Sequence, residues 1–256
     1  MSITQALQVL LPGFVLALLA WGASVRQRDA SLVDRFWSWL VMAPVLALAF
    51  GGPALDARGL IILALGLLWA ARLSLFISWR NWGHGEDRRY AAIRQRNDPG
   101  FALKSLYLVF GLQAVLGCIV ALPLLAGLHD ARPLSWLDGI GAVLALAGIT
   151  CEALADAQLA RFRADSSNRG RVMDQGLWRY SRHPNYFGEA CVWWGLWLLV
   201  PTWWTLVSPL LMSFLLLRVS GVALLEQDIA ERRPEYARYL ATTNAFFPGP
   251  PRKLPR

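Results

Sequence analysis

The chain has 256 residues, of which 56% are hydrophobic and 16% charged, with 13 tryptophans and a formal net charge of +8. An ordinary soluble domain has about 25% charged residues. Together with a mean hydropathy of +0.40, this composition excludes a disordered chain, a coiled coil and a nucleic-acid-binding module, and it predicts an all-α polytopic membrane protein. Cys118, Cys151 and Cys191 lie in apolar stretches without CxxC spacing. We therefore expect no disulfide framework and no metal site.

Apolar stretches of about 20 residues can cross the hydrocarbon core of a bilayer as helices. The expected spans are residues 5–23, 36–55, 59–79, 105–128 and 134–155, followed by two spans that divide the apolar run 186–217. Pro201, with Trp203 and Trp204 just beyond it, predicts a turn at the membrane interface within that run. The sequence thus predicts a bundle of about seven transmembrane helices.

The distribution of basic residues predicts the orientation of these spans. Of the 25 Lys and Arg residues, 22 lie in the loops 26–35, 80–104 and 156–182 and in the segment from Arg218 to the end. Only Arg58 and Arg132 fall in the alternate loops. Because Lys and Arg gather on the cytoplasmic side, we expect the N-terminus outside and the C-terminus in the cytoplasm. The expected location is a bacterial inner membrane, with membrane lipids as partners; the oligomeric state stays open.

The most informative motif is GLWRYSRHPNYFGE, residues 176–189. It gathers groups that can donate or accept hydrogen bonds, Tyr180 and Asn185 among them, immediately before an apolar run. Pro184 is suited to the first position of a helix, where its missing N–H would be unpaired in any case. Glu189 then lies one turn beyond Asn185 on the same face, inside the membrane. This motif predicts a functional site.

A second group of charged residues surrounds the end of the fifth span. Glu152 and Asp156 are four residues apart, so both carboxylates lie on one helical face. Ionisable groups are costly near the membrane, which makes them functional candidates. The arginines that follow are Arg161, Arg163, Arg169 and Arg171. Such a cluster can hold phosphate through charge-assisted hydrogen bonds; a basic loop that meets anionic lipid is the alternative.

Two further polar segments complete the set. The loop WRNWGHGEDRRYAAIRQR, residues 79–96, mixes both charge signs with tryptophans, and its glycines predict a turn around His84. A plain solvated loop is the alternative interpretation. In the C-terminal segment 218–248, Tyr236 and Tyr239 stand at helical spacing after Pro234, which predicts a helix there.

Residues 176–189 and 218–248 resemble the C-terminal half of the steroid 5-alpha-reductase family, and more closely its bacterial relatives, the DUF1295 group. The loop WRNWGHGEDRRY and the string VDRFWS, residues 33–38, also resemble that bacterial group. The wider superfamily includes sterol C14-reductases and isoprenylcysteine carboxyl methyltransferases. The resemblance covers most of the chain, and it implies a single integral membrane domain. Residues 1–130 would form its substrate side and residues 131–256 its cofactor-binding half.

The steroid reductases bind NADPH from the cytoplasmic side and transfer hydride to a carbon–carbon double bond conjugated to a ketone. The resemblance therefore implies a 3-oxo-5-alpha-steroid 4-dehydrogenase-like enzyme with a lipophilic substrate. The cofactor-binding positions that it carries over are Asp156, Arg163, Arg171, Tyr180, Asn185, Glu189, Arg218, Glu226 and Tyr236. Glu226 falls where the steroid reductases have a tyrosine, and it looks more like the acidic position of the methyltransferase branch.

On the substrate side, the steroid reductases grip the ketone with a Gln-Glu pair in an early span and a Tyr in the next. Here Asp34 stands near the acidic position without a preceding Gln, and Trp69 occupies the Tyr position. The expected catalytic residues are Asp34 and Tyr90, with Tyr90 supplying the phenol. The expected substrate-binding residues are Trp37, Trp69, Arg72, Trp79 and Glu86.

Three functions stay open from the sequence. They are an NADPH-dependent reductase, an S-adenosylmethionine-dependent methyltransferase of a lipid or isoprenyl group, and a lipid-binding or transport protein without catalysis. S-adenosylmethionine has no phosphate, so the arginine cluster favours the reductase. Steroid, sterol, isoprenoid and fatty enone all fit an apolar pocket, and the sequence does not choose among them.

Overall fold

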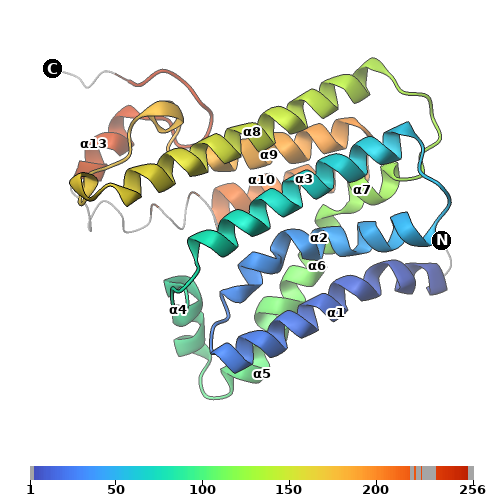
Figure 1. Cartoon of the computed structure of the whole chain (residues 1–256), viewed down its shortest axis with the longest axis horizontal. Coiled ribbons are helices and arrows are strands. Elements are labelled where there is room, and N and C mark those ends of the chain that lie inside the picture. The colour runs from blue at the N-terminus through green and yellow to red at the C-terminus, as the bar shows by residue number, and fades with distance from the viewer. Residues whose placement is uncertain (1–2, 220–221, 223–225, 227–234, 253–256) are drawn as a thin grey trace. The chain divides into compact units, whose positions relative to one another are not determined.

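The structure is a computed structural model that describes residues 3–219, 222, 226 and 235–252. Within these residues the regular elements are all helices, and no strand is present (Figure 1). The chain divides into two compact units. Unit 1 comprises Met1–Asp138 and Leu199–Ser208, and unit 2 comprises Gly139–Leu198 and Pro209–Arg256. The all-α class predicted from the sequence is confirmed.

Unit 1 is built on three long helices that run antiparallel through short loops (Figure 1). They are α1 (Ile3–Gln27), α2 (Leu32–Gly51) and α3 (Ala57–Arg80). The unit continues with α4 (Arg88–Asn97), α5 (Phe101–Ser105), the π-helical η1 (Leu106–Gly111), α6 (Leu112–Val120) and α7 (Leu122–Gly127). The fourth expected span, 105–128, therefore begins earlier and is interrupted near Ala121, because Pro123 in the first turn of α7 has no N–H to continue the preceding helix.

Arg58 holds the loop that follows α7. The residue is only 3% exposed. Its Nε and Nη2 donate to the Asp138 carboxylate at 2.8 and 3.2 Å, and its Nη groups also donate to the carbonyl oxygens of Asp130, Arg132 and Pro133 at 2.7–3.0 Å. All five guanidinium N–H groups are thus used. This network fixes the loop to the start of α3 at the end of unit 1 remote from α4.

Unit 2 contains α9 (Pro184–Leu198) and most of α8 (Trp136–Ala164) and of α10 (Val207–Phe214). Short 3-10 turns, η2 (Ser166–Asn168) and η3 (Gly176–Arg179), lie between α8 and α9. The π-helical η4 (Leu215–Val219) extends α10, and α13 (Glu235–Thr242) confirms the helix expected near the C-terminus.

Small residues bring the backbones of α8 and α9 into contact. A Cβ atom added to Gly148 would lie 2.5 Å from the carbonyl oxygen of Gly188, and one added to Gly195 would lie 2.5 Å from the backbone nitrogen of Ala145. Glycine and alanine at such positions allow membrane helices to approach closely. The approach sets the carboxylates of α8 beside the first turns of α9.

In the described part of the chain, five helices are long and apolar enough to cross a membrane: Val9–Gln27, Leu32–Gly51, Ala57–Arg80, Phe101–Val120 and Trp136–Ala164. The apolar segments α9 and Val207–Val219 are shorter. Large apolar side chains such as Leu19, Leu75 and Val143 are exposed on the long helices, as lipid contact requires. The chain is therefore a multi-pass helical membrane protein, whereas its orientation stays a prediction.

Two span boundaries differ from the expected ones in a way that affects the site. The helix α2 begins at Leu32 rather than near residue 36, so Asp34 lies in its first turn, where a carboxylate complements the helix dipole. The helix α8 continues to Ala164, beyond the expected end at residue 155, because Ala, Leu, Gln and Arg sustain a helix past the apolar core. Arg163 is consequently helical. As expected, α9 begins at Pro184.

Candidate functional site

The described residues contain a polar cluster in unit 1 that unites the two expected catalytic residues. The Tyr90 phenol Oη donates a hydrogen bond to Asp34 Oδ1 at 2.6 Å. Arg89 Nη2 donates to the other oxygen of the same carboxylate at 3.0 Å. Gln113, on α6, donates from Nε2 to Tyr90 Oη at 3.2 Å. We refer to Asp34, Arg89, Tyr90 and Gln113 as the tyrosine cluster.

Three separate helices position this cluster. Gly83, at a φ of +74°, allows the chain to turn between α3 and α4. Asp87 then caps α4 by accepting from the backbone N–H of Arg89, and it also accepts from Arg89 Nε at 2.9 Å. These bonds hold the guanidinium of Arg89 toward α2. Tyr90 follows on the buried side of α4 and is 8% exposed.

The environment of Tyr90 keeps its phenol protonated. Burial and the neighbouring Asp34 carboxylate raise the pKa of Tyr90 well above its ordinary value of 10. At neutral pH the residue is therefore a hydrogen-bond donor rather than a phenolate. The structure thus places a buried O–H donor, fixed by two neighbours, among the helices of unit 1.

Glu86 has a different surrounding from the one expected of a substrate-binding residue. Its carboxylate accepts from Arg94 Nε and Nη2 at 2.9 and 2.7 Å, and from the backbone N–H of Ala30 at 2.7 Å. Burial raises the pKa of Glu86, but the hydrogen bonds from Arg94 and Ala30 outweigh this and hold it below the ordinary value. These contacts tie the loop before α4 to the α1–α2 turn.

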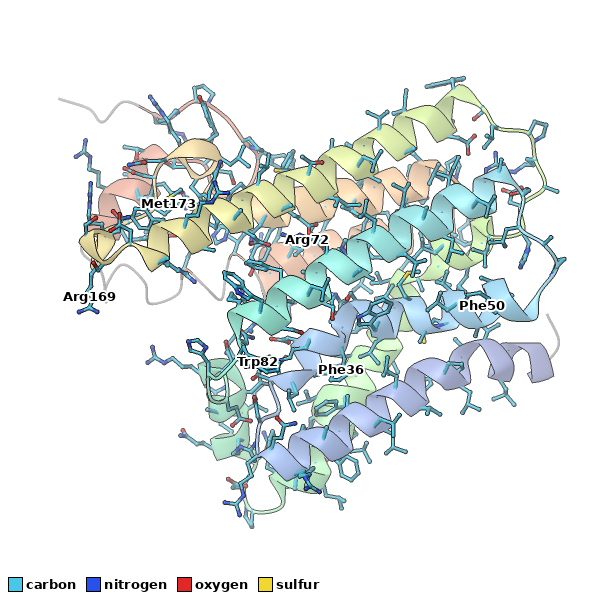
Figure 2. The ribbon with its side chains drawn as sticks, viewed as in Figure 1. Phe36, Phe50, Arg72, Trp82, Arg169 and Met173 are labelled. Atoms are coloured by element: carbon cyan, nitrogen blue, oxygen red, sulfur yellow. The ribbon has the colours of Figure 1, made fainter. Side chains whose placement is uncertain are left out.

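The other expected substrate-binding residues lie along α2 and α3. Trp37 is half-buried on α2, and Trp69 is fully buried on α3. The guanidinium of Arg72 lies 5.5 Å from the ring centroid of Phe76, and Figure 2 shows Arg72 on α3. Trp79 is exposed at the end of the same helix. Their role toward a substrate stays a prediction.

In unit 2, the facing sides of α8 and α9 carry a second cluster. Asn185 Nδ2 donates to Asp156 Oδ1 at 3.2 Å. One turn farther along α9, the buried Glu189 accepts from Trp193 Nε1 at 3.0 Å. Glu152 is buried on α8, one turn before Asp156. The pairing of Asn185 with Asp156 depends on the close approach of the two helices at Gly148 and Gly188.

The arginine-rich part of unit 2 is exposed. Arg163 lies in the last turn of α8 and Arg171 in the loop after η2, where it makes a 3.4 Å hydrogen bond to Asn168 Oδ1. Gly170, at a φ of +86°, turns the chain just before Arg171. Arg169 points away from the helices of unit 2 (Figure 2).

Arg182 and His183, which the sequence analysis did not assign, hold Glu226. Arg182 donates from Nε and Nη2 to the two carboxylate oxygens at 2.7 and 2.9 Å, and His183 Nε2 lies 2.9 Å from Oε1. Burial raises the pKa of Glu226, but the bonds from His183 and Arg182 outweigh it and lower the pKa to about 2. Arg182 Nη1 also donates to the carbonyl oxygens of Leu240 and Thr243. We refer to Arg182, His183 and Glu226 as the C-terminal knot.

Neighbouring residues of the same motif reinforce the knot. Ser181 Oγ donates to the carbonyl oxygen of Phe246 at 2.9 Å, and the phenol of Tyr239 donates to the carbonyl oxygen of Trp178. The motif SRHPNYFGE therefore has two parts. Its first three residues bind the C-terminal segment, whereas Asn185 contacts Asp156 of α8 and Glu189 contacts Trp193 within α9. The only signal of this division in the sequence is the helix start at Pro184.

The remaining expected cofactor positions lie in separate surroundings of unit 2. Tyr180 is exposed after η3, and its carbonyl oxygen accepts from Gly249 N–H. Arg218 is exposed on η4. Tyr236 is buried on α13, with its ring centroid 5.3 Å from that of Tyr239. Within the described part of the chain, no group of three or more His, Cys, Asp or Glu side chains is arranged to hold a metal ion.

Fold and site together define a multi-pass helical membrane protein whose two units each contain polar clusters among the described residues. The chain belongs to the DUF1295 family, described as a protein of unknown function, whose model matches residues 20–243. It is similar to an uncharacterized protein of Schizosaccharomyces pombe, with 29% identity over 276 residues that cover 93% of this chain and 78% of the relative. No solved structure matches the chain. The family expected from the sequence motifs is thus confirmed.

Proposed function

We propose that this protein is an NADPH-dependent reductase of a carbon–carbon double bond conjugated to a ketone in a lipophilic substrate. The observation that supports the proposal most directly is the 2.6 Å hydrogen bond from the buried Tyr90 phenol to Asp34. When hydride adds to the carbon beta to the ketone, negative charge develops on the ketone oxygen. A preorganised donor must meet that charge, and Tyr90 is such a donor.

The tyrosine cluster has the connections that this role needs. Gln113 and Asp34 both hold Tyr90 Oη, so the phenol has a defined position. A ketone oxygen that accepts a hydrogen bond from the Tyr90 phenol would replace Asp34 as the acceptor. The Asp34 carboxylate then keeps its hydrogen bond from Arg89 at 3.0 Å, so that it does not become an unpaired buried charge.

Unit 2 has donors of the kind that a dinucleotide with a 2′-phosphate requires. Asn185 can both donate and accept, which suits a carboxamide or an adenine edge. Arg163 and Arg171 are exposed guanidiniums, and such groups bind phosphate oxygens in paired hydrogen bonds. NADPH, when bound, supplies the hydride. These residues would hold its amide and phosphate groups.

The C-terminal knot favours the reductase over the methyltransferase. Glu226 is the residue that looks most like the acidic position of the methyltransferase branch. In this structure both of its carboxylate oxygens are engaged by Arg182, and one also lies 2.9 Å from His183 Nε2. Binding the cationic S-adenosylmethionine at Glu226 would disrupt these part-buried bonds and leave Arg182 without its carboxylate partner, which opposes such binding.

Titration calorimetry on the detergent-solubilised full chain tests the proposal. We expect NADPH to bind more tightly than NADH, and S-adenosylmethionine to give no measurable heat. Arg171→Ala should weaken NADPH binding about tenfold or more, corresponding to about 1.4 kcal/mol, and the loss should shrink as salt rises. Arg96→Ala, at an exposed arginine of unit 1, is the matched control.

Two results would overturn the proposal. Micromolar binding of S-adenosylmethionine with no heat from NADPH would establish the methyltransferase instead. Binding of neither nucleotide, by a protein that unfolds cooperatively, would favour a lipid-binding or transport protein without catalysis.

A further inference from the structure

Unit 1 contains a groove that the tyrosine cluster does not use. It lies where the end of α1, the start of α2 and the last turns of α3 meet, and its volume is about 240 Å³. Its apolar lining includes Leu32, Phe36 and Trp39, and its polar lining includes Gln27, Arg35 and Ser78. Figure 2 shows Phe36 on α2. The groove thus combines an apolar wall with one cationic side chain, that of Arg35.

Arg35 differs from three other arginines of unit 1 in its partners. Arg58, Arg89 and Arg94 each form an ion pair with a carboxylate. Arg35 is half-buried, and its guanidinium donates from Nη2 to the carbonyl oxygen of Asn81 at 3.0 Å. Among the residues that the structure describes, no carboxylate forms an ion pair with it. The groove therefore carries a positive charge that the described protein groups do not neutralise.

The backbone around Arg35 is fixed. Ser74 Oγ donates to the Arg35 carbonyl oxygen at 2.8 Å, which joins α2 to α3 at this level. The bond to Asn81 holds the guanidinium at the end of α3, close to the segment 80–104, which carries six of the twelve basic residues of unit 1. A cation at the end of a membrane span lies at the depth of the lipid headgroups. Phosphate at that depth forms paired hydrogen bonds with arginine.

We propose that this groove binds one anionic phospholipid, with its phosphate on Arg35 and the first part of an acyl chain against Phe36 and Trp39. Basic pockets between membrane helices on the side of the basic loops bind anionic headgroups in this manner. The volume of about 240 Å³ admits a headgroup phosphate and a few methylene groups, and the remainder of the lipid stays in the bilayer. The proposal is independent of the reductase activity.

Native mass spectrometry on the full chain in detergent, titrated with phosphatidylglycerol or phosphatidylcholine, tests this site. Arg35→Gln removes the charge but keeps an amide that can donate to Asn81. Ala23→Phe fills the groove, which Ala23 lines, without any change of charge. Arg26→Gln removes an exposed charge near the groove and is the matched control.

Phosphatidylglycerol should bind the parent at least tenfold more tightly than phosphatidylcholine. Arg35→Gln and Ala23→Phe should each lower its affinity at least tenfold, and Arg26→Gln less than twofold. Equal affinity for the two lipids would overturn the proposal. An equal loss of phosphatidylglycerol affinity in Arg26→Gln and Arg35→Gln would also overturn it. Displacement of the lipid by millimolar inorganic phosphate would also overturn it, since the site would then take free phosphate. If Arg35→Gln does not fold, Ala23→Phe decides.

Discussion

Tyr90 and Asp34 are 56 positions apart in the chain, yet the phenol of one donates to the carboxylate of the other at 2.6 Å. The contact arises because the loop after α3 turns at Gly83 and directs α4 back to the first turn of α2. Asp87, the N-cap of α4, holds Arg89 and thereby completes the pairing of Asp34. A buried donor with two fixed neighbours is the feature on which the proposed chemistry depends.

Tyr90→Phe should therefore lower kcat/KM for NADPH-dependent enone reduction by about 10²–10³-fold, because a donor to a developing oxyanion is lost. Binding of NADPH should be unchanged, since the substitution removes one hydroxyl in unit 1. Tyr107→Phe, at an exposed tyrosine of the same unit, is the control and should retain full activity. Activity of Tyr90→Phe within threefold of the parent would exclude Tyr90 as the donor.

Asn185→Ala should weaken nucleotide binding while the protein stays folded. The side chain both donates to Asp156 at 3.2 Å and lies on the first turn of α9. Asn185→Asp should be the more damaging change, because it places two carboxylates together. The measurement is the shift of the thermal unfolding midpoint on addition of NADPH. The same shift in Asn185→Ala and the parent would remove Asn185 from the nucleotide site.

The close contact between α8 and α9 predicts that two Gly→Ala substitutions in α8 have different effects on stability. Gly148→Ala should lower the free energy of unfolding of the detergent-solubilised protein by about 1–3 kcal/mol, because the new methyl group would meet the Gly188 carbonyl oxygen and must push the helices apart. Gly139→Ala meets no atom within 4 Å and should be neutral or slightly stabilising. Equal unfolding midpoints for the two variants would contradict the close packing.

Glu226→Gln should destabilise the protein in a pH-dependent manner. Folding lowers the pKa of Glu226 from 4.5 to about 2, so its carboxylate contributes stability that is fully present above pH 4.5 and is lost as the pH falls through 2. At pH 6 we expect the free energy of unfolding of the variant to be about 2 kcal/mol lower than that of the parent. At pH 3 the difference should be smaller. A difference that grows between pH 6 and pH 3 would show that the knot is assigned wrongly.

The orientation can be tested with fusions at the C-terminus. Because the basic residues lie predominantly on one side, a C-terminal green fluorescent protein should fluoresce, since it folds in the cytoplasm. A C-terminal alkaline phosphatase should be inactive there. Phosphatase activity without fluorescence would place the C-terminus outside and reverse the predicted topology.

The amino-acid sequence by itself determined the class of this protein and the positions of its apolar helices. Hydropathy and helix-start signals are local, so the segments that enter the membrane and the start of α9 at Pro184 follow from neighbouring residues alone. The motif SRHPNYFGE likewise identified the family, because it is a contiguous string. Asp34 and Tyr90 were also expected to act in catalysis, but as separate residues.

Only the tertiary structure decided which side chains meet. Arg182 binds Glu226 across 44 positions, and Asp34 lies within hydrogen-bond distance of Tyr90 across 56. Such pairs depend on how closely helices pack and where loops turn, and these in turn depend on many weak contacts distributed over the chain. The sequence pattern therefore could not separate the part of the motif that holds the C-terminal segment from the part that faces α8. Close packing at positions such as Gly148 brings α9 near enough to α8 for polar groups on the two helices to pair, and the sequence pattern does not show this distance.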